Sequence, residues 1–448
     1  MGGGACGMAA ALAISDAGVE AVIFERDSIP AGSTALSSGM VPACVTRQQS
    51  LHDIDDSVSI MAADIQKKAK NLADPTLVQT VCQASGPLVD WLSETHNIEL
   101  ILVEGFLYPG HSCLRMHAPS SRSGVDLING LSRAVEDAGI TIMTDVRVDL
   151  LYVDERATVK GLQIERPDGS TELIGCGSLI LACNGFGGNP DMITRYIETM
   201  AGANYFGHAG NQGDAIQWGL DLGAATRDLG AYQGHGSVAH PHGILISWAL
   251  MMEGGIQINL QGERFSNEHE GYSEQARLVI EQPQSIAWNI FDARLHALGN
   301  DFEDYRRAEK LGALKIARDV EQLAQITNTP LTQLQETLQQ VAQMAENQLE
   351  DKYGRDFTGK PVLTPPYYAV QITGSLFHTQ GGLVVDDQAR VQQQGGGGFP
   401  NLFAGGGAAC GVSGPEDWGY LSGNGLLTAL TLGRIAGMNT AAMMLENL

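Results

Sequence analysis

The start of the chain alternates glycine-rich and apolar segments in a way that predicts a loop, a helix and a strand. Glycines crowd residues 2–7, the run 8–13 predicts a buried helix, and 19–25 is typical of a strand that ends in an acid. A β-α-β unit needs another apolar strand before its glycine loop, but only Met1 precedes Gly2. We therefore expect the first strand to be missing, and we favour a natural start further upstream.

The following segments predict packing helices and then short strands. Apolar positions recur at helical spacing over 77–96 and 123–138. From 141 to 174 apolar and polar residues alternate around the turn Pro167-Asp168-Gly169, which predicts a small β-meander. The apolar run 178–183 predicts a buried strand, and the glycines after it indicate a loop that faces a ligand.

The pattern changes after His240-Pro241. The segment 253–268 predicts a hairpin that turns near Gln261-Gly262, and 303–353 is helical and rich in glutamine. Glycine-rich segments return at 374–382. The end of the chain then predicts a strand over 401–404, a glycine loop, and a long helix over 425–445.

These patterns together predict an α/β protein with two domains. Residues 1–239 and 374–448 are expected to form a discontinuous Rossmann-like, dinucleotide-binding domain that lacks its first strand. Residues 240–373 are expected to form an inserted α+β domain that caps the substrate site.

Composition narrows the class of protein. Apolar residues make up 44% and charged residues 17% of the 448 positions, which suits a compact enzyme. Lys and Arg total 27 against 51 Asp and Glu, a balance that repels nucleic acid and anionic membranes. No stretch approaches the roughly 18 apolar residues that span a bilayer. We therefore expect no nucleic-acid partner and no membrane segment.

The cysteines indicate a reducing compartment. There are seven, they are scattered, and none forms a C-x-x-C pair. We therefore predict a cytoplasmic location and no metal site. The same spacing excludes c-type haem attachment and cysteine-ligated iron–sulfur clusters, so a redox relay would need a separate electron donor or acceptor.

The first glycine segment carries a dinucleotide-binding motif. Gly2, Gly4 and Gly7 match G-x-G-x-x-G, and Glu25 lies 21 residues beyond Gly4, where a carboxylate binds ribose hydroxyls. A glycine-rich turn with a solvated acid is the alternative. A dehydrogenase that binds only NAD would also use this motif, but it would not explain the glycine-rich segments near the C-terminus.

Later segments predict further contacts to a cofactor. Residues 32–39 combine small and hydroxyl side chains that allow a flat ring to approach the backbone, and 421–426 predicts backbone N–H groups at a helix start. The predicted cofactor-binding residues are Gly2, Gly4, Gly7, Glu25, Arg26, Ser33, Thr34, Ser38, Gly39, Ala182, Gly185, Asp214, Gly406, Gly425 and Leu426.

As a set, these segments resemble the fumarate reductase/succinate dehydrogenase flavoprotein superfamily, which also contains 3-ketosteroid dehydrogenases and urocanate reductases. The resemblance covers nearly the whole chain. It also rests on the segments Leu181 to Gly188, Gly213-Asp214, His240-Pro241, Gly262 to Glu268, His378 to Gly382 and Asn401 to Leu426. It implies that FAD binds between a cofactor domain and a capping domain and exchanges a hydride with a carbon of a CH–CH or C=C bond.

The resemblance also implies the catalytic residues. Fumarate reductases of the family use two arginines, one after an R-F-x-N-E motif and one before the last helix, where this chain has Tyr272 and Tyr420. Tyrosines there resemble the ketosteroid dehydrogenase branch, so we expect Tyr272 to act as base or acid and Tyr420 to donate a hydrogen bond to an oxyanion. His378 matches a histidine that contacts substrate or flavin.

Comparison with the family also predicts how FAD is held. The family's proton-path residues align with Ser247-Trp248 and Met251, which cannot carry protons in the same way. No residue of 32–39 matches the histidine that binds FAD covalently in membrane-bound relatives, so we expect non-covalent FAD. Gly407 stands where the family often has a glutamate, which predicts weaker binding.

The function expected from the sequence is that of an FAD-dependent oxidoreductase acting on CH–CH groups, which dehydrogenates or reduces a carbon–carbon bond beside a carbonyl of a small molecule. A ketone is preferred, and either direction is open. One alternative is an unsaturated-carboxylate reductase that clamps its substrate with Arg115, Arg122 or Arg277. Another is a flavin-binding remnant without turnover.

The sequence also predicts roles for several charged residues and histidines. Arg115, His117 and Arg122 form a predicted basic cluster that would suit an anionic substrate, and the alternative is a few surface charges that pair with nearby acids. Arg264 and Glu268 are expected to form structural hydrogen bonds only. His240 is expected either to close a loop or to contact substrate.

Overall fold

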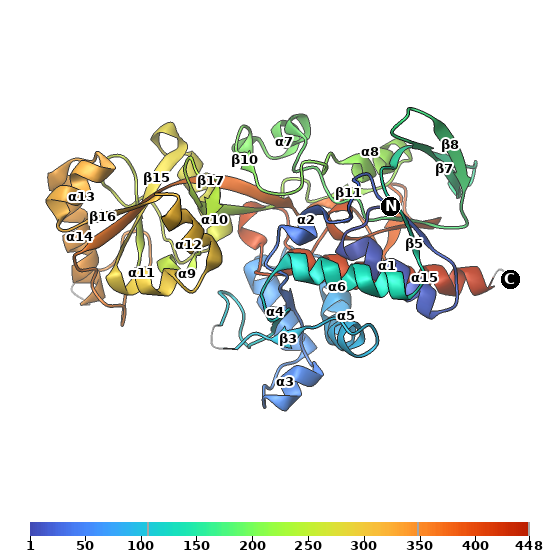
Figure 1. Cartoon of the computed structure of the whole chain (residues 1–448), viewed down its shortest axis with the longest axis horizontal. Coiled ribbons are helices and arrows are strands. Elements are labelled where there is room, and N and C mark those ends of the chain that lie inside the picture. The colour runs from blue at the N-terminus through green and yellow to red at the C-terminus, as the bar shows by residue number, and fades with distance from the viewer. Residues whose placement is uncertain (105–106, 347–348, 447–448) are drawn as a thin grey trace. The chain divides into compact units, whose positions relative to one another are not determined.

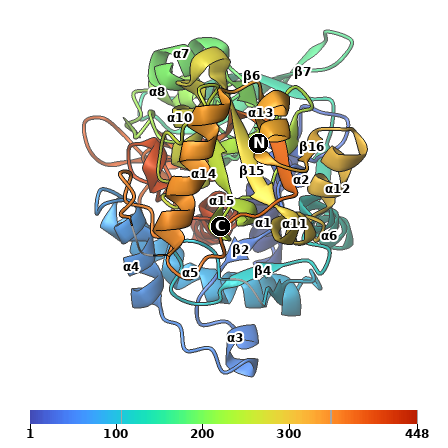
Figure 2. The ribbon, with the colours of Figure 1, turned by 90° about the vertical axis from the view of Figure 1, so that its left-hand side faces the viewer.

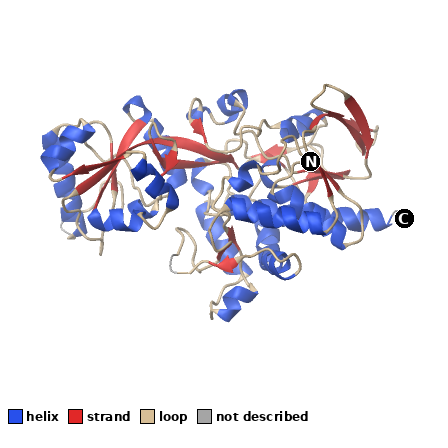
Figure 3. Cartoon of the chain, in the orientation of Figure 1, coloured by secondary structure: helices blue, strands red, loops and turns tan. Residues whose placement is uncertain are grey.

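The computed structural model describes residues 1–104, 107–346 and 349–446. The chain forms two compact units. Unit 1 comprises Met1–Glu198, Phe206–Gln233 and His378–Leu448, and unit 2 comprises Thr199–Tyr205 and Gly234–Phe377. Both units mix helices and strands (Figure 3).

The chain passes between the units at four places: after Glu198, after Tyr205, and inside the two strands β12 (Tyr232–Ala239) and β17 (Tyr367–Thr379). Unit 2 contains the whole predicted insert, residues 240–373, and a few residues on either side of it. The assignment of cofactor and capping roles to these ranges stays a prediction.

Two closely packed helices form the core of unit 1. Helix α1 (Ala5–Asp16) packs against α15 (Asn424–Glu446) and also against α6 (Gly124–Asp137), as Figure 1 shows. A Cβ at Gly433 or Gly437 would overlap backbone carbonyl oxygens of α1, so glycine permits this close approach. The predicted buried helix at the start of the chain is confirmed.

The parallel strands of unit 1 form two groups. Strand β1 (Val22–Phe24) pairs in parallel with β5 (Thr141–Met143). Strand β9 (Leu179–Leu181) pairs in parallel with β20 (Gly398–Ala404), which is antiparallel to β19 (Arg390–Gln392). The predicted buried strand over 178–183 is confirmed, because all three residues of β9 are buried.

The backbone of Met1 and Gly2 connects these two groups by hydrogen bonds. The Met1 amino group donates to Ile180 O at 2.9 Å, and Ala182 N donates to Met1 O at the same distance. On the other side, Gly2 N donates to Phe24 O at 2.8 Å. Met1 and Gly2 therefore lie where a strand between β1 and β9 would pair.

The predicted meander is confirmed except at its first strand. Strands β6 (Arg147–Val153), β7 (Val159–Glu165) and β8 (Thr171–Gly175) form an antiparallel sheet. The prediction was wrong for Thr141–Met143, because this segment pairs with β1. The predicted helices 77–96 and 123–138 correspond to α5 (Pro75–Glu94) and α6.

The remaining elements of unit 1 are short connections around this core. They are α2 (Gly32–Ala35), β2 (Val41–Pro42), α3 (Arg47–Leu51), α4 (Val58–Lys68), β3 (Ile101–Leu102), β4 (Met116–Ala118), α7 (Pro190–Tyr196), α8 (Asp214–Asp221), β11 (Thr226–Arg227) and β18 (Gly382–Leu383). Strand β4 lies between β2 and β3 in a small sheet.

Unit 2 is built on a mixed sheet whose strand order is β13-β12-β17-β15-β14, with β10 and β16 also paired to β17. Every residue of β15 (Ile286–Asp292) is buried, as expected for a strand covered on both faces. Helices α10 (Tyr272–Ile280) and α11 (Ala293–Gly299) pack against it (Figure 2). The other elements are β10 (Asn204–Tyr205), β13 (Ile244–Leu245), α9 (Ala249–Met252), β14 (Ile256–Ile258), α12 (Glu303–Lys310), β16 (Leu314–Ala317), α13 (Val320–Thr327) and α14 (Leu331–Ala345).

The predicted hairpin over 253–268 was wrong, although its turn exists. Gly262 N donates to Asn259 O, so the chain turns where expected, but β14 pairs with β15 instead of the residues after the turn. Those residues are held by ion pairs of Arg264 with Glu268 and Asp351. The helical segment 303–353 contains three helices and one strand, and its residues 347–348 lie outside the described part of the chain.

Within residues 1–104, 107–346 and 349–446, no helix has both the length and the apolar character needed to cross a membrane.

Candidate cofactor and substrate site

The predicted glycine loop leads directly into α1. Gly4 is the N-cap of this helix, and a Cβ at Gly4 would meet only Thr34 Oγ1, 3.5 Å away. A Cβ at Gly7 would overlap the Gly2 carbonyl oxygen, so glycine is required where the loop folds back on the helix. The loop therefore leaves an open helix start, which is a favourable place for a phosphate.

Glu25 lies beside this loop at the end of β1. Its Oε2 accepts a hydrogen bond from Gly3 N at 2.7 Å, and its Oε1 accepts one from Asp27 N at 3.0 Å. The carboxylate is thus fixed next to the glycines with acceptor capacity left for another ligand. This placement is the one expected of a carboxylate that binds ribose hydroxyls.

Asp214 and Arg26 also lie in unit 1. Asp214 is the first residue of α8, and burial raises the pKa of its carboxyl group, although the positive charges of Arg26 and Arg147 oppose the rise. Arg26 packs against Gly210, where a Cβ would overlap its guanidinium group. This contact holds the guanidinium group whose positive charge acts on the Asp214 carboxyl group.

The hydroxyl-rich segment after Glu25 is tied to two other parts of unit 1. Thr34 Oγ1 accepts a hydrogen bond from Ala5 N at 3.1 Å, which joins the segment to the start of α1. Ser33 Oγ accepts from Asn211 Nδ2 at 2.9 Å. Gly39 packs on the residue before α6, where a Cβ would lie 2.7 Å from Ser123 O, and Ser38 is exposed.

A second group of closely packed glycines lies where β9 ends. A Cβ at Gly407 would lie 2.8 Å from Gly185 N and 3.1 Å from His378 Cε1, so only glycine fits between them. Gly406 is the preceding residue, and Ala182 connects β9 to this loop. Gly185, Gly406 and His378, which the sequence predicted separately, are therefore brought together with Gly407.

His378 is buried in unit 1 and uncharged at neutral pH. Burial lowers the pKa of its imidazole to about 4. Its Nδ1 lies 2.7 Å from Gln380 Nε2. The ring is therefore a fixed, neutral hydrogen-bonding group.

Tyr420 lies close to the start of α15. A Cβ at Gly425 would be 3.6 Å from Tyr420 Oη. Burial raises the pKa of Tyr420 to about 12, although hydrogen bonds from the Gly425 and Gly423 backbone partly offset the rise. Tyr420 therefore keeps its proton at neutral pH and can donate a hydrogen bond. Leu426 continues α15 after Gly425.

Asn424, the first residue of α15, carries an unsatisfied polar atom. The side chain is completely buried, yet its Oδ1 has no hydrogen-bond partner among the described residues. Buried oxygens are nearly always paired in folded proteins, so this atom indicates a position for a ligand group or a water molecule.

Tyr272 belongs to unit 2, where it begins α10 inside an aromatic cluster. Its ring stacks on His235, with centroids 4.9 Å apart and planes 20° apart. Trp248 and Phe377 also contact His235, at centroid distances of 5.8 and 5.6 Å. Burial lowers the pKa of His235 to about 3, so the rings around Tyr272 carry no charge at neutral pH.

His235 and Gln380 are site residues that the sequence did not predict. His235 lies on β12 outside the motifs that carried the family resemblance. Gln380 lies inside the His378 to Gly382 segment, so its distance of two residues from His378 was the only available signal.

The position of α10 is fixed by close backbone packing. A Cβ at Gly236, next to His235 on β12, would lie 2.6 Å from the Gln275 carbonyl carbon. Gln275 Nε2 donates to Gln257 Oε1 at 2.8 Å and also to Ser266 Oγ. The helix that carries Tyr272 is therefore locked against the strand that carries His235.

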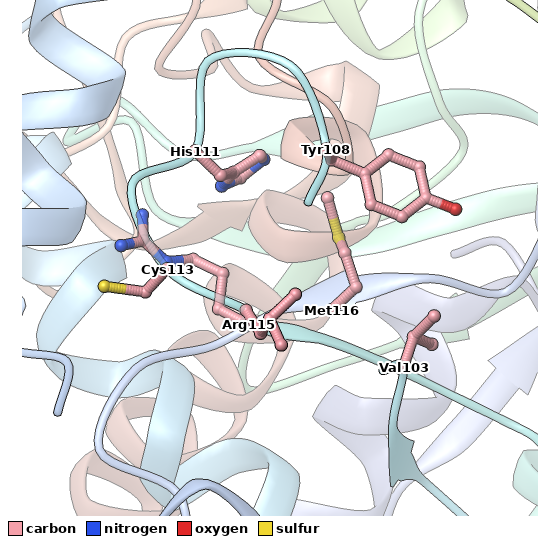
Figure 4. Close-up of a pocket in the computed structure, with 7 residues that line it drawn as sticks. Val103, Tyr108, His111, Cys113, Arg115 and Met116 are labelled. Atoms are coloured by element: carbon pink, nitrogen blue, oxygen red, sulfur yellow. The ribbon is translucent and has the colours of Figure 1, made fainter. Parts of the chain in front are cut away.

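The prediction of a free basic group for an anionic substrate was wrong for Arg115, and the alternative, pairing with nearby acids, is what the structure shows for this residue. Arg115 is completely buried and binds Asp56 at 2.9 Å and Asp64 at 2.7 Å, so both ends of its guanidinium group are occupied. Its side chain lines a pocket together with His111 and Cys113 (Figure 4). Burial lowers the pKa of His117 to about 4, which leaves it neutral. Arg115 is therefore not free to clamp a substrate carboxylate, because acidic neighbours satisfy it inside the protein.

Other charged residues have structural partners. Arg277 pairs with Glu281 at 2.8 Å on the surface of α10. The prediction of structural hydrogen bonds for Arg264 and Glu268 is confirmed, at 3.0 and 2.6 Å. His240 is exposed, and its backbone N–H donates to Gln371 O, which leaves its proposed role untested. In the described part of the chain, no three His, Cys, Asp or Glu side chains converge on a possible metal position.

The residues of unit 1 fit FAD. Two helix starts, at Gly4 and Asn424, offer backbone N–H groups, of which Gly425 N–H at the second start already donates to Tyr420. Glu25 offers a carboxylate beside the first start. The hydroxyl of Thr34 lies at the same loop, and that of the adjacent Ser33 accepts a hydrogen bond from Asn211. The unsatisfied Oδ1 of Asn424 marks a polar position at the second helix start.

Comparison with known proteins agrees with this fit. A family model described as FAD binding domain matches residues 1–426. A probable fumarate reductase of Shewanella frigidimarina is 28% identical over all of this chain and 75% of its own length. A urocanate reductase of Eggerthella lenta is 27% identical over 99% of this chain and 74% of its own length.

Solved structures show the same fold. An open flavocytochrome c3 fumarate reductase matches with a TM-score of 0.83 and 28% identity, over 98% of this chain and 77% of that one. A 3-ketosteroid-Δ4-(5α)-dehydrogenase of Rhodococcus jostii matches with a TM-score of 0.78 and 22% identity, over 98% and 95%. The chain therefore belongs to the FAD binding domain family, as an FAD-dependent oxidoreductase of the fumarate reductase and succinate dehydrogenase flavoprotein type.

Proposed function

We propose that this flavoprotein dehydrogenates or reduces a carbon–carbon bond beside a carbonyl group, with a cyclic or hydrophobic ketone preferred over a carboxylate. The observation that carries the proposal is the uncharged aromatic cluster around Tyr272 in unit 2. Such a surface suits an apolar ring better than a dicarboxylate, because it offers no positive charge to a carboxylate.

The proposal assigns one step to each of two tyrosines. As a phenolate, Tyr272 takes a proton from the carbon beside the carbonyl, and as a phenol it returns the proton in the opposite direction. Tyr420 keeps its proton, so it donates a hydrogen bond to the carbonyl oxygen and stabilises the enolate that forms. FAD supplies the hydride acceptor or donor for the neighbouring carbon. Loss of one proton and one hydride converts the CH–CH bond into C=C.

FAD is proposed to bind non-covalently in a Rossmann-like arrangement. Glu25 would hold ribose hydroxyls, the start of α1 would face the pyrophosphate, and the start of α15 would face the flavin. Gly407 would lie close to the cofactor without contributing a side-chain hydrogen bond. Unit 2 would cap the substrate. A small-molecule substrate, a separate electron donor or acceptor, and a cytoplasmic location complete the proposal.

An unsaturated-carboxylate reductase is the second candidate, because several relatives are named as fumarate or urocanate reductases. The ion pairs of Arg115 with Asp56 and Asp64 weigh against it. The clamp would then rest on Arg122 or Arg277, and Arg277 already pairs with Glu281.

The deciding experiment is a flavin oxidation assay on the purified chain loaded with FAD. The flavin is reduced anaerobically with dithionite, and its absorbance is followed after adding a cyclic enone or a matched enoic acid. Rapid reoxidation by the enone supports the proposal, whereas reoxidation only by the acid supports the second candidate. Bound flavin that neither substrate reoxidises, and that no saturated ketone reduces, would identify a remnant without turnover.

A further inference from the structure

A chain of buried side chains connects His378 to the start of α15. Gln380 Nε2 lies 2.7 Å from His378 Nδ1, and Ser413 Oγ lies 3.0 Å from Gln380 Oε1. Asn424 Nδ2 lies 3.4 Å from Ser413 Oγ and completes the chain. Gln380, Ser413 and Asn424 are 4%, 1% and 0% exposed, so bulk water does not compete for these bonds.

All the hydrogen bonds of this chain have the same donor-to-acceptor direction, from Asn424 towards His378. Asn424 donates to Ser413, Ser413 uses its single proton to donate to Gln380 Oε1, and Gln380 Nε2–H donates to His378. His378 Nδ1 must then accept, because a nitrogen that carries a proton cannot accept from an N–H group. A neutral imidazole in this position therefore holds its proton on Nε2.

Backbone bonds hold Gln380 itself in place. Gln380 N donates to Ala231 O, and Gln380 O accepts from Gly411 N, both at 2.8 Å. The packing of Gly407 against His378 Cε1 limits ring movement on another side. The amide of Gln380 is thus anchored at its backbone and at both ends of its side chain.

We propose that Gln380 is a positioning residue: through Ser413 and Asn424 it fixes His378 as the neutral Nε2–H tautomer, which presents a hydrogen-bond donor to the substrate carbonyl. The donor role rests on the proposed function, whereas the tautomer does not. Because the same chain begins at the first residue of α15, movement of that helix start is coupled to the orientation of the imidazole.

Two variants at Gln380 test the direction of the chain. Gln380→Glu replaces the donating amide with a carboxylate that can only accept, so the proton of His378 moves to Nδ1 or both nitrogens become protonated. Gln380→Leu removes both bonds and leaves a mixture of tautomers. Gln79→Glu, an exposed glutamine on α5, makes the same change of charge at the surface and is the matched control.

The primary readout is the ¹⁵N spectrum of the FAD-loaded protein labelled at its histidines. His378→Gln identifies the signals of His378 among those of the 11 histidines. We expect the wild type and Gln79→Glu to show a protonated Nε2 and an unprotonated Nδ1, and Gln380→Glu to show a protonated Nδ1. A wild type with its proton on Nδ1, or an unchanged spectrum in Gln380→Glu, would overturn the proposal.

Turnover gives the second readout. With the best substrate found, Gln380→Leu should lower kcat/KM about 10-fold to 100-fold, the scale of one hydrogen bond to a developing charge, without changing the flavin spectrum. If Gln380→Leu does not fold, Ser413→Ala and Ser413→Thr replace it. The alanine variant frees the amide and mixes the tautomers, and the threonine variant restores Nε2–H. Since the spectrum needs no substrate, failure of the proposed reaction is distinguished from failure of this inference.

Discussion

The imidazole ring of His235 lies parallel to the phenol ring of Tyr272, with centroids 4.9 Å apart and planes 20° apart. The two residues come from a strand and a helix far apart in the sequence, and Gly236 allows those elements to touch. The stack therefore holds the phenol ring in one orientation, and this packing does not depend on the hydroxyl group. This separates the packing role of the ring from the chemical role of the hydroxyl.

Tyr272→Phe tests the chemical role alone. The variant keeps the ring that stacks on His235 and removes the hydroxyl that the proposed reaction uses for proton transfer. We expect kcat/KM to fall by roughly 100-fold to 10,000-fold, the usual contribution of a general acid or base. The flavin spectrum and the melting temperature should stay at the wild-type values.

Tyr353→Phe is the control, because Tyr353 also lies in unit 2 and its hydroxyl donates to Arg264 O. Its effect should be on stability and not on the chemical step. A Tyr272→Phe enzyme that turns over as fast as the wild type would remove Tyr272 from the mechanism.

Gly236→Ala tests the packing role. The added Cβ would lie 2.6 Å from the Gln275 carbonyl carbon, so α10 must move away from β12. Overpacking of this kind costs about 1–3 kcal/mol. We expect the free energy of unfolding, measured in urea, to fall by that amount, and turnover to fall strongly. Gly395→Ala is the control, since no atom lies within 4 Å of a Cβ there. Equal stability of the two variants would contradict the packing argument.

The elements with strong local patterns were predictable from the sequence. The small apolar residues of α1, the alternation in β6 to β8 and the buried run of β9 each belong to one element with a clear period. The error at Thr141–Met143 arose because a short strand has the same alternation whichever strand it pairs with. Pairing depends on long-range packing, which local periodicity does not encode.

The site was predictable only in part for the same reason. Glycines such as Gly7 and Gly407 are conspicuous because their place is dictated by backbone contact. The sequence left open whether Arg115 is a free positive charge or an ion-pair partner, because Asp56 and Asp64 lie on other segments of the chain. His235 belongs to none of the sequence motifs, and its place in the site follows from its contacts with three aromatic rings.

Glu25→Gln should weaken FAD binding without unfolding the protein. The glutamine has the same shape, but it loses the charge that strengthens hydrogen bonds to ribose hydroxyls. Bonds to a charged group contribute about 1.5–3 kcal/mol, so the Kd for FAD should rise about 10-fold to 150-fold when the apoprotein is titrated by fluorescence. Glu20→Gln, at an exposed position before β1, should bind FAD like the wild type. Unchanged affinity in Glu25→Gln would place the ribose elsewhere.

Buried neutral histidines should make the protein sensitive to mild acid. Burial lowers the pKa values of His111, His117 and His378 to about 4 and that of His235 to about 3. An unfolded histidine titrates near pH 6.5, so the unfolded chain binds more protons below that pH. Their stabilising contribution is present above pH 6.5 and is lost as the pH falls towards 4, by at most about 1.4 kcal/mol per pH unit for each histidine.

His117→Gln tests this slope. The free energy of unfolding is measured in urea between pH 7.5 and 5, and the variant should lose stability less steeply than the wild type. His52→Gln, at a surface histidine, controls for the substitution itself. Parallel slopes for His117→Gln and the wild type would mean that His117 is already protonated in the folded protein.

Arg115→Met should cost far more stability than a surface arginine. The side chain of Arg115 has no exposed surface, and its removal would leave the buried carboxylates of Asp56 and Asp64 without their cation. Breaking a buried ion pair from one side costs about 3–5 kcal/mol, because an unpaired charge stays in the interior. Arg47→Met, which removes an exposed partner of Glu94, should unfold at nearly the wild-type urea concentration. If Asp56→Asn and Asp64→Asn are added to Arg115→Met, most of the loss should be recovered, since no buried charge then remains. A triple variant as unstable as Arg115→Met would show that packing, and not charge, dominates at this site.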